Sequence, residues 1–103
     1  MKTTETQVVR ACLNYLRIKN HLVARINNGA FETRCGGWVK TCDIPGFPDI
    51  TGITHDGKAL AVECKSSIGK LSRPQEVFKA AWIARGGLYI TAKSIDDLRE
   101  AGL

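Results

Sequence analysis

Two apolar segments separated by a short turn are the strongest constraint that this sequence places on its fold. Residues 48–54 read Pro-Asp-Ile-Thr-Gly-Ile-Thr, and residues 58–65 read Lys-Ala-Leu-Ala-Val-Glu-Cys-Lys. Between them lies His55-Asp56-Gly57, and an Asp-Gly pair flanked by apolar segments is a strong hairpin signal. We therefore expect two antiparallel strands side by side. The apolar residues 59–62 predict that the second strand is buried on both faces.

The register of this hairpin decides which side chains meet. Paired residues have a constant sum of numbers, which is 112 or 113 for a turn centred on Asp56-Gly57. The first register places Asp49 opposite Glu63, and the second places it opposite Cys64. Glu63 and Lys65 share one face because side chains alternate along a strand. Asp49 joins them only in the first register, and the sequence leaves both registers open.

The remaining elements follow from capping and periodicity. Thr4 and Gln7 have the spacing of a capping box, as do Ser72 and Gln75, and apolar residues recur at helical spacing after each. We predict helices from 4 to 20, from 72 to 86 and after Ser94, strands at 22–26 and 88–91, and a short edge strand at 38–41 within a polar segment. The order αβββαβα predicts an α/β fold with a central mixed sheet of about four strands flanked by helices.

Composition narrows the class of protein. The 103 residues suffice for one domain, expected to span 1–103. The net charge of +5 favours a polyanionic partner such as nucleic acid. We expect no membrane-spanning segment and no export signal, and hence a cytoplasmic protein with reduced cysteines. Cys35 and Cys42 are too far apart for a usual zinc knuckle.

The candidate chemistry lies at the end of the hairpin. Asp49, Glu63 and Lys65 converge on a strand pair that is otherwise apolar. Two neighbouring carboxylates repel each other, and a shared proton, a salt bridge to the lysine or a divalent cation can relieve that repulsion. Oxygen ligands suit Mg²⁺ or Mn²⁺, and Mg²⁺ usually takes one or two carboxylates and keeps several waters. A surface salt bridge is the plainer explanation, but the apolar strand leading into Glu63 argues against it.

These residues resemble the motif of the PD-(D/E)xK nuclease superfamily. Pro48-Asp49 is followed by Glu63-Cys64-Lys65, with the strands and helices in the order of that superfamily's core. More narrowly, the chain resembles a stand-alone VRR-NUC domain, the virus-type replication-repair nuclease family. The further residues that carry this resemblance are Glu5, Arg25-Ile26-Asn27-Asn28-Gly29, Gly46-Phe47 and Ser72-x-x-Gln75.

The resemblance implies a restriction-endonuclease-like fold and a metal-dependent DNA endonuclease. Asp49, Glu63 and the backbone carbonyl of Cys64 would bind Mg²⁺ or Mn²⁺, and Lys65 would orient the attacking water. It further implies branched or four-way-junction DNA as substrate, a role in replication, repair or recombination, and a homodimer. The protein would act in the cytoplasm of a bacterium or of a phage-infected host.

Two accessory residues have competing explanations. Glu5 matches a first-helix acid that supports the metal site, but acids are also favoured in a first helical turn. Gln75 matches a polar residue that faces the site and is assigned a catalytic role by the resemblance, but its capping-box position is a sufficient explanation. The two roles of Gln75 are compatible only if its side chain does not fold back onto the cap.

Nucleic-acid contacts are expected from polar and basic side chains around the site. The candidates are Arg25, Asn27, Arg34, Lys40, Lys70 and Arg73. Trp38 and Trp82 do not lie in an aromatic series suited to base stacking. The alternative to a nuclease is a catalytically silent nucleic-acid-binding module on the same fold, and a further one is a small interaction protein with a basic surface.

Overall fold

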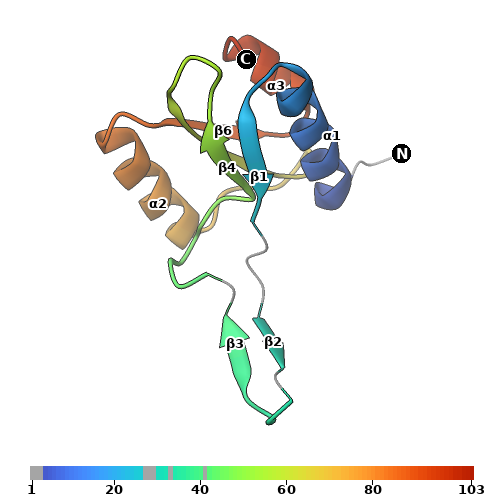
Figure 1. Cartoon of the computed structure of the whole chain (residues 1–103), viewed down its shortest axis with the longest axis vertical. Coiled ribbons are helices and arrows are strands. Elements are labelled where there is room, and N and C mark those ends of the chain that lie inside the picture. Colours follow the sequence, from blue (N-terminus) through green and yellow to red (C-terminus); the bar gives the residue numbers. More distant parts are fainter. Residues whose placement is uncertain (1–3, 27–29, 33, 41) are drawn as a thin grey trace.

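The computed structural model describes residues 4–26, 30–32, 34–40 and 42–103, with the backbone alone for 30–32 and 38–40. The described elements, drawn in Figure 1, are α1 (Glu5–Ile18), β1 (Leu22–Arg25), β2 (Ala30–Glu32), β3 (Trp38–Lys40), β4 (Ile50–Ile53), β5 (Ala59–Cys64), α2 (Arg73–Ala84), β6 (Leu88–Ala92) and α3 (Ile95–Glu100).

Four of these strands form a mixed sheet in the order β1-β4-β5-β6. β4 pairs antiparallel with both β1 and β5, whereas β5 and β6 are parallel. A parallel pair needs a long crossover connection, and α2 supplies it. The predicted α/β class, the four-stranded mixed sheet and the order αβββαβα are therefore confirmed for the body of the protein.

β2 and β3 form a separate two-stranded ribbon, which extends away from the sheet in Figure 1. A strand is present where the sequence predicts one at 38–41, although Thr41 lies outside the described residues. Its partner β2 is not predicted, because a three-residue strand is too short to show an alternating pattern.

The first helix begins and ends where the sequence predicts. Thr4 Oγ1 accepts a hydrogen bond from the Gln7 N–H at 3.2 Å, and the Thr4 N–H donates to Gln7 Oε1 at 2.9 Å. This reciprocal pair provides hydrogen-bond acceptors for two backbone N–H groups at the helix start. After Ile18 the chain turns at Asn20, whose φ of 71° is the left-handed conformation that asparagine tolerates better than most residues.

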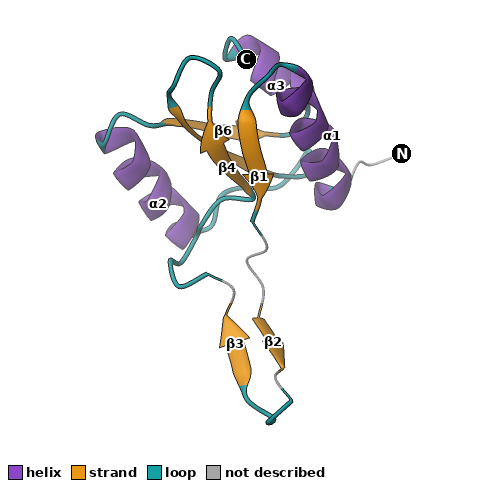
Figure 2. Cartoon of the chain, viewed as in Figure 1, coloured by secondary structure: helices purple, strands orange, loops and turns teal. Residues whose placement is uncertain are grey.

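The sheet separates α2 from the other two helices, as Figure 2 shows. On one face, α1 and α3 enclose the main core, which includes Leu16, Leu60, Val62, Ile90 and Leu98. On the other face, the α2 residue Phe78 lies 6.4 Å from the Tyr89 ring, measured between centroids. β5 is buried from Leu60 to Cys64 because both of its faces are covered, which confirms the prediction from its apolar sequence.

Candidate active site

A three-residue loop sets the register of the β4–β5 hairpin. The Thr54 N–H donates to the Lys58 carbonyl at 2.8 Å, and the Gly57 N–H donates to the Thr54 carbonyl at 2.9 Å. Gly57 closes the loop with a φ of 90°, a left-handed conformation that glycine adopts without steric conflict. The loop therefore comprises residues 55–57, which decides between the two registers that the sequence leaves open.

The hairpin places Asp49 beside Glu63. Ile50 pairs with Val62, and their numbers sum to 112. The next position outward puts Asp49 opposite Glu63, on the face that α2 covers. The Asp49 carboxylate also accepts a hydrogen bond from the Cys64 N–H at 2.9 Å. The structure thus has the register in which the two acids share a face.

Glu63 is the centre of the site and is only 4% exposed. Its Oε1 accepts a hydrogen bond from Gln75 Nε2 at 2.9 Å and lies 3.7 Å from Lys65 Nζ. Burial, followed by the neighbouring charge of Asp49, raises the Glu63 pKa from the usual 4.5 to about 8, while Lys65 acts in the opposite direction. Burial and the neighbouring acid therefore both favour the protonated form of Glu63.

Gln75 caps α2 and contacts Glu63 at the same time. Its Oε1 accepts from the Ser72 N–H at 2.8 Å, which completes the predicted capping box. Its Nε2 donates to Glu63 Oε1 at 2.9 Å. The sequence interpretation that the two roles are compatible only if the side chain does not fold back onto the cap is therefore wrong, because the acceptor and donor ends of one amide serve different partners.

Gly46 lets the chain before Asp49 lie against the start of α2. A Cβ atom at this position would be 2.3 Å from the Pro74 carbonyl oxygen and 2.6 Å from the Gln75 nitrogen. Gly46 also has a φ of 74°, which side chains rarely permit. Close backbone approach at Gly46 therefore holds the segment leading into Asp49 beside the helix turn that carries Gln75.

Two hydroxyl-bearing residues of β6 complete the surroundings of Glu63. Thr91 is the direct parallel partner of Glu63, and Tyr89 lies two residues earlier on the same face. Among the described residues, neither Thr91 Oγ1 nor the Tyr89 hydroxyl has a hydrogen-bond partner, although both are buried, and the same is true of Glu63 Oε2. Sequence reasoning missed both residues, because the register of a parallel pair across a helical crossover leaves no signal in one sequence.

Glu5 is not gathered into this cluster. It lies exposed in the first turn of α1. Within the described residues, its carboxylate makes no hydrogen bond or ion pair with Asp49, Glu63 or Lys65. Stabilisation of the helix terminus is sufficient to explain an acid there, and its role in the site stays a prediction.

The predicted nucleic-acid contacts occupy three regions. Lys70 and Arg73 are exposed on the connection between Lys65 and Gln75 and at the start of α2. Arg25 is exposed at the end of β1, where it pairs with Ile50 and so belongs to the face opposite Glu63.

The third region is the ribbon. Arg34 is exposed in the turn between β2 and β3. Lys40 ends β3, but its side chain lies outside what the structure describes, as does the whole of Asn27.

The donor set fits a hard divalent cation better than zinc. The described residues contain no group of three or more His, Cys, Asp or Glu side chains placed to hold a metal. Two carboxylates with an unpaired oxygen on Glu63 nevertheless match Mg²⁺, which needs few protein ligands. The Cys64 N–H points to Asp49, and a residue's N–H and C=O leave an extended strand at the same edge, so the Cys64 carbonyl also faces this side.

Comparison of the chain with known protein families, curated proteins and solved structures finds no match in any of the three. None of the described helices is long and apolar enough to cross a membrane.

Proposed function

We propose that this protein is a metal-dependent nuclease that hydrolyses phosphodiester bonds in DNA. The observation that carries the proposal is the meeting of Asp49, Glu63 and Lys65 on one covered face of a hairpin, with Glu63 Oε2 unpaired. A buried polar atom without a partner costs about 1–3 kcal/mol. A cation bound there would be a partner for Oε2, whereas the salt bridge to Lys65 involves only Oε1.

The arrangement also supports membership of the VRR-NUC family and the restriction-endonuclease-like fold. The Pro48-Asp49 and Glu63-Cys64-Lys65 motifs lie at the matching ends of neighbouring antiparallel strands. α2 follows as the crossover to a parallel strand and presents Gln75 to the acid. The motif residues are therefore next to one another in space as well as in the expected order.

Asp49, Glu63 and the Cys64 carbonyl would hold the Mg²⁺ or Mn²⁺ ion, which polarises the phosphate and lowers the pKa of the attacking water. Gln75 keeps Glu63 Oε1 engaged, so the carboxylate presents Oε2 in one orientation. The Asp49 carboxylate is oriented in the same way by the Cys64 N–H. Ligands that are already hydrogen-bonded lose little freedom when a cation binds.

Lys65 would act on the water and the phosphate. Its side chain is 12% exposed, so the ammonium is shielded from bulk water but can reach a substrate. Positioned there, it donates hydrogen bonds to the attacking water and to a phosphate oxygen, and it offsets the negative charge that develops as the water attacks phosphorus and the opposite P–O bond breaks.

The basic character of the chain supports DNA as the polyanionic substrate, since the net charge is +5. We extend the proposal to branched or four-way-junction DNA, to a homodimer and to a cytoplasmic role in replication, repair or recombination, as the family resemblance implies. A symmetric junction needs two cuts, and a twofold dimer supplies two sites.

The test is a cleavage assay on labelled duplex, flap and four-way-junction DNA with Mg²⁺, with Mn²⁺ and with chelator. The variants are Glu63→Ala and Lys65→Ala, and the matched controls are Glu76→Ala and Lys58→Ala, which change exposed residues outside the site. We expect metal-dependent cutting that only the first two variants lose.

Two results would overturn the proposal. Cutting that survives in both site variants would show a different active site or a contaminant. Binding without cutting in either metal would favour the silent binding module. Sedimentation of the free protein tests the dimer separately from the chemistry.

A further inference from the structure

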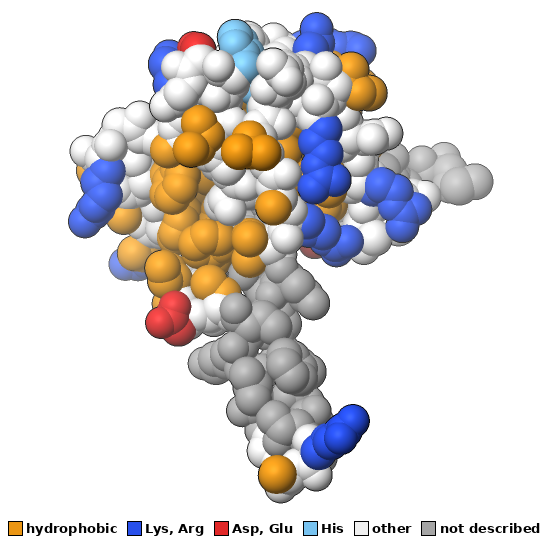
Figure 3. Space-filling model, viewed as in Figure 1, with side chains coloured by type: hydrophobic (Ala, Val, Ile, Leu, Met, Phe, Trp, Pro, Cys, Tyr) orange, Lys and Arg blue, Asp and Glu red, His pale blue; other side chains and the backbone are white. Residues whose placement is uncertain are grey.

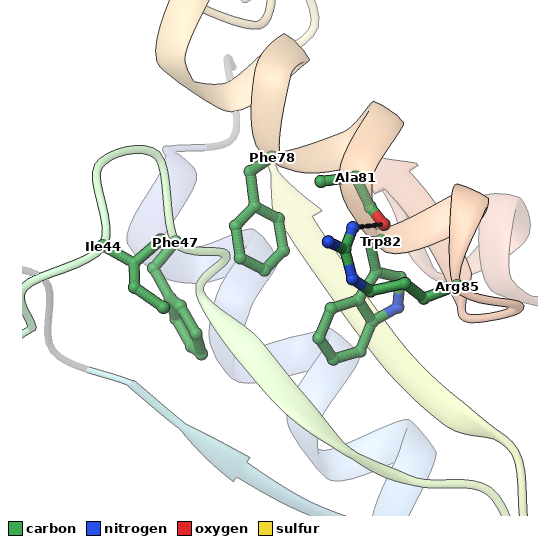
Figure 4. A pocket seen from close by; sticks show the side chains of 6 residues that line it. All are labelled: Ile44, Phe47, Phe78, Ala81, Trp82 and Arg85. Carbon is green, nitrogen blue, oxygen red and sulfur yellow. Dashed lines mark hydrogen bonds between the residues drawn. The ribbon is translucent and has the colours of Figure 1, made fainter.

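An apolar pocket of about 330 Å³ lies between α2 and the loop that leads into Asp49 (Figure 4). Its lining residues are Ile44, Phe47, Phe78, Ala81, Trp82 and Arg85. The volume lies near the lower end of the range for small-ligand sites, about 300–1,000 Å³. Figure 3 shows hydrophobic side chains gathered on this face of the molecule. The lining residue Ile44 is 49% exposed, so the pocket reaches solvent.

Three aromatic rings form the walls. The centroids of Phe47 and Phe78 are 5.2 Å apart in an edge-on arrangement, and those of Phe78 and Trp82 are 5.4 Å apart and stacked. Trp82 Nε1 donates to the Leu88 carbonyl at 3.1 Å, which fixes the indole. Phe78 and Trp82 are four residues apart on α2, whereas Phe47 comes from a separate segment that only the fold brings beside them, so the complete set of rings leaves no signal in the sequence.

The pocket residues lie close in sequence and in space to the candidate active site. Phe47 precedes Asp49 by two residues, and Phe78 follows Gln75 by about 4.5 Å along the helix axis. Phe78 also contacts Tyr89, with 6.4 Å between centroids, and Tyr89 lies on the face that carries Glu63. A nucleotide next to a phosphate held at the acids is therefore within reach of the rings.

The charges of α2 and of the connection before it suit a polyanion. Residues 70–85 carry four cations, Lys70, Arg73, Lys79 and Arg85, against one acid, Glu76. Arg85 belongs to the pocket wall, where its Nη1 donates to the Ala81 carbonyl at 2.9 Å. A basic track beside partly exposed aromatic rings is the combination by which proteins bind single-stranded nucleic acid, since every base can stack on a ring.

We propose that this pocket receives an unpaired base of single-stranded DNA beside the phosphate that is cut. This inference rests on the proposed nuclease function and deepens it, because it makes the substrate a DNA with unpaired nucleotides at a branch or flap. Fully paired duplex has no base free to enter the pocket, so it binds through phosphate contacts alone.

The test measures binding in chelator, so that cleavage is not needed. A flap DNA carries the fluorescent base 2-aminopurine at each of the first unpaired positions in turn, and a duplex of the same length is the comparison. Phe78→Leu removes a ring but keeps apolar volume, Phe47→Leu repeats the change on the opposite wall, and Val77→Ala is the control on the exposed side of α2.

We expect the wild type to quench one 2-aminopurine position by stacking. Each Phe→Leu change should weaken flap binding by about fivefold to hundredfold and leave duplex binding unchanged, while Val77→Ala changes neither. Melting curves establish which variants remain folded, and either folded wall variant suffices for the test.

Equal flap affinity in wild type and both folded wall variants would overturn the inference, and so would the absence of quenching at every position. Concentration-dependent dimers that Phe78→Leu dissociates, with DNA affinity unchanged, would instead assign the pocket to a second copy of the chain. If 2-aminopurine is quenched by the wild type and not by the wall variants, but no DNA is cleaved in Mg²⁺ or Mn²⁺, the nuclease proposal is wrong and the base pocket stands. If both wall variants cleave flap DNA as fast as the wild type, the base pocket is wrong and the nuclease proposal stands.

Discussion

Replacing Glu63 with glutamine should stabilise the metal-free protein while removing its proposed activity. The glutamine has nearly the same shape, and its Oε1 can still accept the hydrogen bond from Gln75 Nε2. Its amide nitrogen takes the place of Oε2, which has no hydrogen-bond partner among the described residues. What the substitution removes is the buried negative charge beside Asp49.

The size of this effect follows from the pKa of Glu63, which is raised from 4.5 to about 8. Between these values the folded protein binds more protons than the unfolded chain, so its stability falls as the pH rises through that window. At about 1.4 kcal/mol per pKa unit, the full loss above pH 8 is about 5 kcal/mol. Burying a glutamine amide costs about 1–3 kcal/mol. We therefore expect Glu63→Gln to be more stable by roughly 2–4 kcal/mol at pH 9, and no more stable than the wild type at pH 5.

The assay is urea or thermal unfolding of the wild type, Glu63→Gln and the exposed control Glu76→Gln at both pH values, in chelator. For a domain of this size, the gain at pH 9 corresponds to a rise in Tm of roughly 10–20 °C. Adding Mg²⁺ should stabilise the wild type and Glu76→Gln by mass action but not Glu63→Gln. A difference between wild type and Glu63→Gln that is the same at pH 5 and pH 9 would refute the assignment of a destabilised carboxyl at this position.

Three further predictions follow from the same structure. Lys65→Ala should lower the single-turnover cleavage rate by about 10²–10³ without preventing metal binding, whereas Lys58→Ala on the exposed turn should not change it; equal rates would exclude Lys65 from the chemistry. Gly57→Ala should lower the free energy of unfolding by about 1–2 kcal/mol through its positive φ alone. Gly46→Ala should lower it further, because the added Cβ would also lie 2.3 Å from a backbone oxygen of α2. Denaturation curves that give equal losses for the two variants would contradict the close approach at Gly46. Burial lowers the pKa of His21 below its ordinary 6.5, and its Nδ1 accepts a backbone N–H at 3.0 Å, so the stability it contributes is present above pH 6.5 and lost as the pH falls through the lowered pKa. Because Glu63 acts in the opposite direction over this range, the measurement is the difference in melting between wild type and His21→Gln, which should shift in favour of the variant between pH 7.5 and pH 5.5; an unchanged difference would contradict the assignment.

The elements that sequence reasoning predicts well are those specified by neighbouring residues. Thr4 and Ser72 form the expected capping boxes, and the Asp-Gly turn forms the expected hairpin. Local hydrogen bonds determine these features, so their signatures are short. The register of the hairpin could be predicted only as one of two alternatives, because it depends on whether the loop has three residues. The hydrogen bond from the Gly57 N–H to the Thr54 carbonyl fixes the loop length, and the sequence does not reveal that bond.

The features that sequence reasoning misses depend on residues far apart in the chain. Thr91 meets Glu63 only through a parallel pairing across α2, and no short motif encodes that register. The dual role of Gln75 requires the position of the helix start relative to β5, which the backbone contact at Gly46 helps to set. The apolar residues before Glu63 indicate that it is buried, but nothing in the sequence reveals that one of its oxygens has no partner.

The arrangement of Glu63 between a hairpin and a crossover helix also has a consequence for the order in which the molecule assembles. The hairpin joins residues that are near in sequence, so it can close early, while Asp49 and Glu63 are still hydrated and both ionised. Gln75, Tyr89 and Thr91 reach the acids only when the later connection folds over the sheet. During synthesis, that segment leaves the ribosome last. Dehydration of the acids, and the proton uptake by Glu63 that accompanies it, therefore belong to the closing step of folding, and an acidic medium or a bound cation should speed that step rather than the first.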